Sequence, residues 1–181
     1  MALGATVFRL EIALSDVDRG VYTSLDLRVA QHPSETLRYL VTRALAYSLS
    51  YEEGIAFSKG GLSDVDDPPI SVRDPTGVLV AWIDVGNPSA ERLHRASKAA
   101  RRVEVYTTHD LALLRREAGS RAIHRVESID VYPLPQPFVD ELAAKLERTT
   151  RIELTRTDGQ LYAAVAGATL EATVERAGLV E

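Results

Sequence analysis

The chain has 181 residues, a formal net charge of -5 at pH 7 and no cysteine. A chain of this length buries about 70% of the surface that its unfolded form would expose, so it needs no disulfide or metal ion for stability. The absence of cysteine excludes a disulfide framework, a thiolate nucleophile and a cysteine-containing zinc site. The negative charge opposes binding of a polyphosphate by the whole surface, so any contact with nucleic acid must be local.

The N-terminal segment lacks the features of a signal peptide. In residues 1–14 no basic segment comes first, and Arg9 and Glu11 interrupt the apolar stretch. No run of the chain approaches the roughly 18 apolar residues of a membrane-spanning helix. We therefore expect a cytoplasmic protein that does not contact a membrane, folded as a single domain over residues 1–181.

The first part of the chain predicts a hairpin followed by a helix. Alternating apolar residues in 6–14 and 21–32 indicate two antiparallel strands, joined by the turn "SDVDRG". Residues 32–50 carry apolar side chains at helical spacing, with Ser34 as the expected N-cap. Glu35 would then lie in the first turn of this helix.

The middle of the chain predicts a buried strand that leads directly into a basic helix. Residues 54–60 indicate a short strand, and residues 61–77 are rich in Gly, Pro and Asp, which predicts a loop. The apolar run 78–85 is the next strand. The helix expected over 87–102 begins with Asn as its cap and Pro at the first helical position.

The last part of the chain alternates strands and helices before a final hairpin. We expect strands at 102–108 and 121–135, helices at 109–119 and 135–149, and a hairpin over 150–167. Strand, helix, strand, helix, strand in the middle, with a hairpin at each end, favours the α/β (α+β) class. The expected architecture is one mixed β-sheet flanked by helices, with N- and C-terminal hairpins.

A carboxylate lies in the apolar stretch "VAWIDVGN" at the end of the strand 78–85. Asp84 needs a cation, a hydrogen-bond donor or water, because an unpaired buried carboxylate is costly. A structural partner such as an arginine is the simpler interpretation. The alternative is a site for a hard divalent cation, which prefers oxygen ligands. Further carboxylates that could join such a site, or serve as loop and helix caps, are Glu35, Asp64, Asp66, Asp67 and Asp74.

Basic residues recur at spacings of three and four in the helix that follows Asp84. They are Arg92, Arg95, Lys98 and Arg102, and this spacing predicts one basic helix face. Such a face is either a solvated surface or a surface that binds the phosphates of a nucleic acid. For the second interpretation we name Arg92, Arg95 and Arg102 as the candidate contacts.

Several short motifs carry a resemblance to a known family. "HPSET" at 32–36, "FSKG" at 57–60, the acidic loop "GLSDVDDPP", "WIDVGNP" at 82–88 and "VYTT" after the basic helix look like the YaeQ family. Their order and spacing match over essentially the whole chain. That family is bacterial, and its fold resembles a variant of the PD-(D/E)XK nuclease, or restriction-endonuclease-like, core. The resemblance implies hydrolysis of phosphodiesters with Mg²⁺ or Mn²⁺ as cofactor.

The resemblance also implies roles for particular residues. By this resemblance, Glu35 corresponds to the helix residue and Asp84 to the strand residue that hold the metal ion in that superfamily. A catalytic lysine is expected two positions after the strand carboxylate, where this chain has Gly86. Superfamily members can supply this lysine from an adjacent helix, so Lys98 is the candidate, with Lys59 as a second.

A further departure leaves two hypotheses for the function. The first strand aspartate of the superfamily falls on Pro69, which has no ligand atom in its side chain, so Asp67 or Asp66 must substitute as metal ligand. If one does, the protein is a metal-dependent nuclease-like protein that cleaves or binds nucleic acid. Otherwise it is a non-catalytic interaction or regulatory protein that retains the fold and binds a protein partner.

Overall fold

The computed structural model describes residues 4–59 and 66–180, and divides into two compact units. The first unit comprises residues 1–49 and 134–174, and the second comprises 50–133 and 175–181. Each unit has its own β-sheet and its own pair of α-helices. The prediction of one folding domain stays a prediction, because a compact unit need not fold independently.

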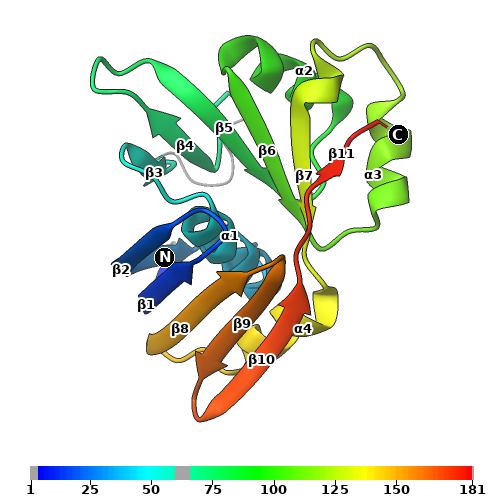
Figure 1. Ribbon diagram of the computed structural model, residues 1–181. Helices are drawn as coiled ribbons and strands as arrows, with labels where there is room; N and C mark the ends of the chain where they lie inside the picture. The colour runs from blue at the N-terminus through cyan, green and yellow to red at the C-terminus, as the bar shows by residue number, and fades with distance from the viewer. Residues whose placement is uncertain (1–3, 60–65, 181) are drawn as a thin grey trace. The chain divides into compact units, whose positions relative to one another are not determined.

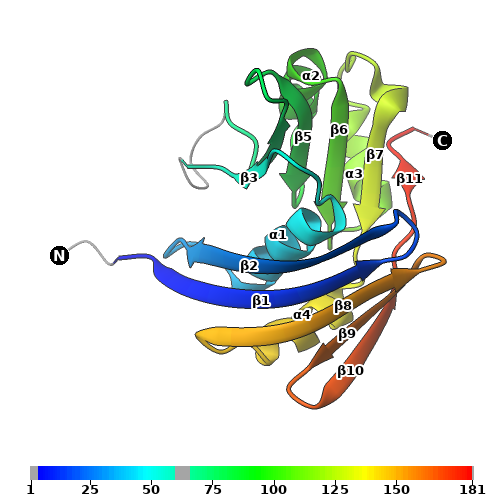
Figure 2. The same cartoon turned by 60° about the vertical axis from the view of Figure 1, so that its left-hand side comes forward.

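The first unit is a five-stranded mixed sheet. In the order in which they pair, its strands are β10 (Ala168–Thr173), β9 (Gln160–Val165), β8 (Thr149–Thr157), β1 (Thr6–Asp16) and β2 (Val21–Gln31). The hairpins β1–β2 and β8–β9 confirm the two predicted from alternation, and β8 joins β1 in parallel. The long curved strands β1 and β2 are seen in Figure 2.

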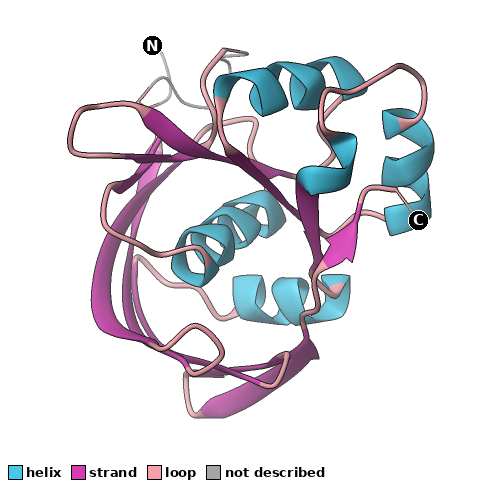
Figure 3. Ribbon diagram, turned by 45° about the horizontal axis from the view of Figure 1, so that its top comes forward, coloured by secondary structure: helices cyan, strands magenta, loops and turns pink. Residues whose placement is uncertain are grey.

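Two helices, α1 (Leu37–Leu49) and α4 (Gln136–Ala144), pack against one face of this sheet. Leu10, Ile12 and Leu14 of β1 point toward this face and are buried, while the residues between them are more exposed. Figure 3 shows both helices on the inner side of the curved strands. This arrangement buries the apolar stripe of each helix, as the helical spacing in 32–50 predicts.

The start of α1 differs from the prediction. Thr36 caps the helix, because its Oγ1 accepts the N–H of Tyr39 at 3.1 Å. Ser34 is therefore not the N-cap, and Glu35 precedes the helix instead of lying in its first turn. The reason is a turn before the helix, in which the N–H of Glu35 donates to the carbonyl of His32 at 2.8 Å.

The second unit is a six-stranded sheet. In pairing order its strands are β11 (Ala177–Gly178), β7 (Ile129–Pro133), β6 (Arg102–Thr107), β5 (Leu79–Val85), β4 (Ile70–Arg73) and β3 (Ile55–Phe57). β5, β6 and β7 are parallel, and their crossovers are the helices α2 (Ala90–Ala99) and α3 (Leu111–Ala118). The other pairs are antiparallel.

Helices α2 and α3 cover one face of this sheet and share a core with it (Figure 1). Leu93 of α2 and Leu114 of α3 are fully buried against strand residues that include Trp82. No helix in residues 4–59 and 66–180 is long and apolar enough to cross a membrane.

Several element boundaries in the second unit correct the predictions. The expected loop 61–77 contains β4, which is held by pairing with β3 and β5. Ser89, not Asn87, caps α2, because its side chain accepts the N–H of Arg92. The helix ends at Ala99, so Arg102 lies on β6. The strand predicted over 121–135 is extended only in β7, and a 3₁₀ turn, η2 (Val126–Ser128), precedes β7.

The α+β class is confirmed, but the strands form two mixed sheets where the sequence predicted one. The strands β10 and β11 lie beyond the predicted final hairpin.

Candidate functional site

Asp84 is buried near the carboxyl end of β5. It points to the same face of the sheet as Trp82, as alternation along a strand requires, and both residues are 2% exposed. The face is the one covered by α2. A carboxylate in this position must be compensated by hydrogen bonds or by a cation.

Arg92 of α2 supplies the cation. Its Nε donates to Oδ2 of Asp84 at 2.7 Å, and the indole Nε1–H of Trp82 donates to the same oxygen at 3.0 Å. The Arg92 guanidinium lies 5.3 Å from the centre of the Trp82 ring, a cation–π distance. Its Nη2 also donates to the backbone carbonyl of Asp67 at 3.2 Å. Arg92 therefore connects the start of α2, the end of β5 and the acidic loop.

In this arrangement the hydrogen-bonding capacity of the Asp84 carboxylate is directed at protein donors. Oδ2 of Asp84 already accepts two N–H groups, and Oδ1 has a 3.3 Å contact from the N–H of Val85. The carboxylate of Asp67 accepts the hydroxyl of Ser58. Within residues 4–59 and 66–180, no three His, Cys, Asp or Glu side chains gather as metal ligands. Asp64 lies outside the described residues.

Glu35 is also paired with an arginine, within the first unit. Nη2 of Arg43 donates to both carboxylate oxygens, at 2.9 and 3.1 Å, and to the carbonyl of Ala30 at 2.9 Å. The Glu35 side chain has no exposed surface, and it accepts the N–H of His32 at 3.1 Å. These contacts fix the turn between β2 and α1. Among the described residues of its own unit, neither Glu35 nor Asp84 contacts another of the predicted metal-binding side chains through a hydrogen bond or ion pair.

The predicted basic face is largely neutralised. Besides the Arg92–Asp84 pair, Arg95 pairs with Asp66 and with Glu91, the latter at 3.7 Å. Arg102 pairs with Glu52 and Glu104 from its position on β6. The two lysines differ from these arginines. Lys98, in the last turn of α2, and Lys59, which follows β3, both have exposed side chains.

A polar cluster that the sequence reasoning missed lies on the other face of β6. The hydroxyl of Ser50 donates to Oε2 of Glu104 at 2.6 Å and lies 2.9 Å from the hydroxyl of Tyr106. The rings of Tyr106 and Tyr132 stack with their centres 4.8 Å apart. The signal was alternation in "RVEVYTT", which places Glu104 and Tyr106 opposite the apolar valines.

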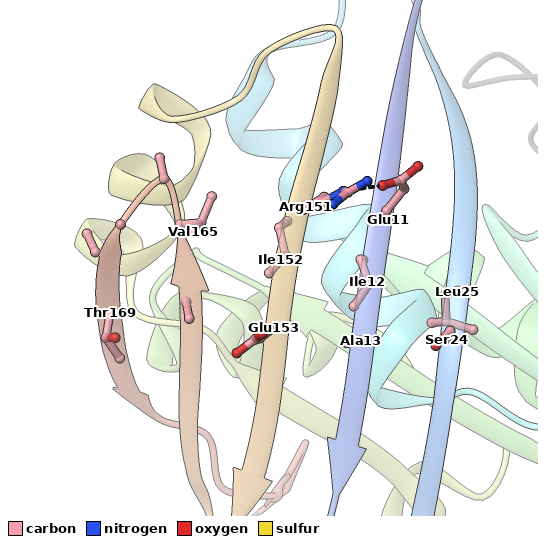
Figure 4. A pocket seen from close by; sticks show the side chains of 14 residues that line it. Glu11, Ile12, Ala13, Ser24, Leu25, Arg151, Ile152, Glu153, Val165 and Thr169 are labelled. Carbon is pink, nitrogen blue, oxygen red and sulfur yellow. Dashed lines mark hydrogen bonds and ion pairs between the residues drawn. The ribbon is translucent and has the colours of Figure 1, made fainter.

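The outward face of the first sheet carries a shallow hollow of about 570 Å³ (Figure 4). Glu11 accepts a hydrogen bond from Nε of Arg151 at 2.8 Å beside it. None of the predicted site residues lines this hollow. It forms where one row across the strands has mostly short side chains: Ser24, Ala13, Glu153, Ala164 and Thr169.

His94 on α2 gives a pH-dependent prediction. Partial burial lowers the pKa of His94 from its usual value, and repulsion from Lys98, Arg121 and His124 lowers it further. The unfolded chain therefore binds a proton at this histidine more readily than the folded protein. The neutral His94 ring contributes fully to the free energy of unfolding above about pH 6.5, the pKa of histidine in the unfolded chain. This contribution is lost as the pH falls toward the lower pKa that His94 has in the folded protein.

The variant His94→Gln is expected to lose less stability than the wild type between about pH 7.5 and about pH 5.5. Urea denaturation at both pH values measures this difference. Identical losses in the two proteins would contradict the prediction.

Two mixed sheets, each with two helices, define the class as an α+β protein, and its candidate site is a buried strand aspartate paired with an arginine. Comparison with known proteins then gives the family. A sequence model described as "YaeQ protein" matches residues 1–174. The chain belongs to the YaeQ family, which confirms the resemblance seen in the sequence motifs.

Relatives match over most of the chain. "Uncharacterized protein YaeQ" of Escherichia coli (strain K12) is 27% identical over 164 residues, which is 90% of each protein. The protein of the same description from Salmonella typhi is 27% identical over 172 residues, 94% of each.

Two solved structures are similar in fold. The YaeQ protein from Pseudomonas syringae has a TM-score of 0.85 with 28% identity, over 95% of each chain. The YaeQ protein from Xanthomonas axonopodis pv. citri has a TM-score of 0.86 with 31% identity, over 96% of this chain and 98% of that one.

Proposed function

We propose that this YaeQ-family protein is non-catalytic, retains a variant of the restriction-endonuclease-like core, and acts by binding partner molecules. The observation that carries the proposal is the Arg92 guanidinium on the Asp84 carboxylate. Arginine stays protonated throughout the physiological pH range, so it is a permanent counter-charge at this position. A divalent cation would have to displace this guanidinium to reach Oδ2 of Asp84.

Two features of the chain support the same proposal. Gly86, at the position of the superfamily's lysine, has φ of 91°, a backbone conformation that favours glycine, and its N–H donates to the carbonyl of Tyr106. Pro69, at the position of the first aspartate, offers no side-chain ligand. At these two positions the residues present contribute backbone hydrogen bonds, because the carbonyl of Pro69 likewise accepts the N–H of Ser58.

A Mg²⁺- or Mn²⁺-dependent nuclease is the second candidate. The observation that favours it is that Arg92 contacts both Asp84 and the backbone of Asp67, so two of the predicted ligands lie near one cation. Glu35 as a third ligand, and Lys98 or Lys59 as the catalytic lysine, stay predictions.

Calorimetric titration of MgCl₂ and MnCl₂ into the wild type, Asp84→Asn and Arg92→Gln separates the two candidates. We expect no saturable heat for the wild type at millimolar metal, and no metal-dependent cleavage of single- or double-stranded oligonucleotides. Binding that appears only in Arg92→Gln would support the proposal, because it would show that the arginine occupies a latent site. Wild-type binding and cleavage that are both lost in Asp84→Asn would overturn it.

A further inference from the structure

Four basic side chains gather around α2 and the loop that follows α3, all in the second unit. His94 and Lys98 lie one turn apart on the same face of α2. Arg121 and His124 come from the loop between α3 and η2. We call His94, Lys98, Arg121 and His124 the basic patch. Lys98, Arg121 and His124 are exposed, and His94 is partly buried.

The loop is fixed against α2 by backbone and side-chain contacts. The N–H of His124 donates to Nδ1 of His94 at 3.1 Å. Nη2 of Arg125 donates to the carbonyls of Ser97 and Ala100 at 3.0 and 3.1 Å, which satisfies carbonyls at the end of the helix. Ile123, the residue before His124, is part of the core. The patch is therefore preorganised, and a ligand would not have to order the loop on binding.

The hydrogen bond from His124 also fixes which nitrogen of His94 carries the proton. Because Nδ1 accepts the N–H, the neutral ring bears its hydrogen on Nε2. That N–H is the donor that His94 can offer to a ligand. Partial burial is the main cause of the lowered pKa of His94. Repulsion from Lys98, Arg121 and His124 adds to it, which shows that these three groups lie close to the ring.

The cations of the basic patch lack the carboxylate partners that neutralise the neighbouring arginines. Within residues 4–59 and 66–180, Lys98 and Arg121 form no hydrogen bond or ion pair, whereas Arg92, Arg95 and Arg102 are each paired with a carboxylate. Cations that are near one another without counter-charges repel, and an anion bound between them relieves that repulsion.

We propose that the basic patch binds the phosphate group of a ligand, with the Nε2–H of His94 donating near its centre and Lys98, Arg121 and His124 around it. Phosphate matches this arrangement, because it carries up to two negative charges and several acceptor oxygens. The inference deepens the proposed function, since it names the chemistry that a non-catalytic protein of this family would recognise. The phosphate is either that of a small molecule or that of a nucleic-acid backbone.

The first experiment follows the histidine ring resonances by NMR while inorganic phosphate is added at constant ionic strength. We expect a saturable shift of His94 in the wild type. The double variant Lys98→Gln/Arg121→Gln should bind about tenfold more weakly or worse, because two charge-assisted contacts are removed. The control Arg28→Gln/Arg148→Gln removes the same charge from exposed positions of the first unit and should bind as the wild type does.

The second experiment identifies the source of the phosphate. Fluorescence anisotropy with a labelled single-stranded oligonucleotide in EDTA measures binding without any metal-dependent reaction. Tighter binding of the oligonucleotide than of inorganic phosphate, with a steep salt dependence that weakens in the double variant, indicates a nucleic-acid backbone. Equal and weak binding of both indicates a small phosphorylated ligand.

The absence of a saturable shift in the wild type would overturn the inference, and so would equal binding by the wild type and the Lys98→Gln/Arg121→Gln variant. Either result leaves the non-catalytic proposal standing, because that proposal is decided by the metal titration and the cleavage assay.

Discussion

Replacing Arg92 with alanine is expected to lower the free energy of unfolding by about 2–4 kcal/mol, because it leaves a buried carboxylate without its cation. The Asp84 side chain is 3% exposed and the Arg92 side chain 21%, so water can compensate the aspartate little once the guanidinium is gone. The cation–π contact with Trp82 is lost as well. Urea denaturation followed by Trp82 fluorescence measures the change, since this is the only tryptophan in the chain.

The matched control is Arg95→Ala, which removes an arginine from the same helix. The Arg95 side chain is 42% exposed and its acidic partners are at the surface, so the expected loss is under about 1 kcal/mol. Equal losses in the two variants would mean that Asp84 does not depend on Arg92. That result would remove the main support for a non-catalytic site.

Local patterns were sufficient to predict most elements of the fold. Alternation gave the hairpins β1–β2 and β8–β9, and helical spacing gave α1, because each pattern lies within one short segment. The strand β4 was missed for the opposite reason. Its four residues follow a Pro-Pro pair, and pairing with β3 and β5 holds them extended. Such non-local pairing overrides local signals.

The division into two sheets could not be predicted from the sequence. It depends on the parallel pairing of β8 with β1, in which Thr149 is opposite Arg9. It depends also on the pairing of β7 with β6, which places β7 in the other sheet. Nothing within either segment specifies which distant strand is its neighbour. The alternation of apolar residues shows only which face of each strand is buried.

For the candidate site, the sequence predicted that Asp84 needs a compensating group but did not identify that group as Arg92. The apolar neighbours of Asp84 indicated that it requires a cation or a donor, and the structure provides Arg92, eight residues along the chain. The carboxylates that neutralise Arg102 and Arg95, Glu52 and Asp66, lie 50 and 29 residues away in sequence. The basic face was therefore predicted without the distant carboxylates that neutralise its arginines. The cations that stay unneutralised are those of the basic patch, Lys98 and Arg121.

Replacing Arg156 with alanine is expected to lower the free energy of unfolding by about 3–5 kcal/mol, because it breaks a buried ion pair in the first unit. Nε and Nη2 of Arg156 donate to the two oxygens of Asp16 at 3.1 and 2.6 Å. The Asp16 side chain has no exposed surface, and the Arg156 side chain is 8% exposed. The two residues are opposite each other at the end of the parallel β1–β8 pair.

Arg151→Ala is the control for this change, since it lies on the same strand and also removes an ion pair with β1. The Arg151 side chain is 87% exposed, so its pair with Glu11 should contribute less than about 1 kcal/mol. Arg156→Lys should restore only part of the loss, because an ammonium group cannot donate to both carboxylate oxygens in the planar fork that a guanidinium forms. Chemical denaturation of the three variants tests the ranking. A loss for Arg156→Ala as small as that for Arg151→Ala would show that Arg19 alone compensates Asp16, from its present Nη1–Oδ2 distance of 3.8 Å.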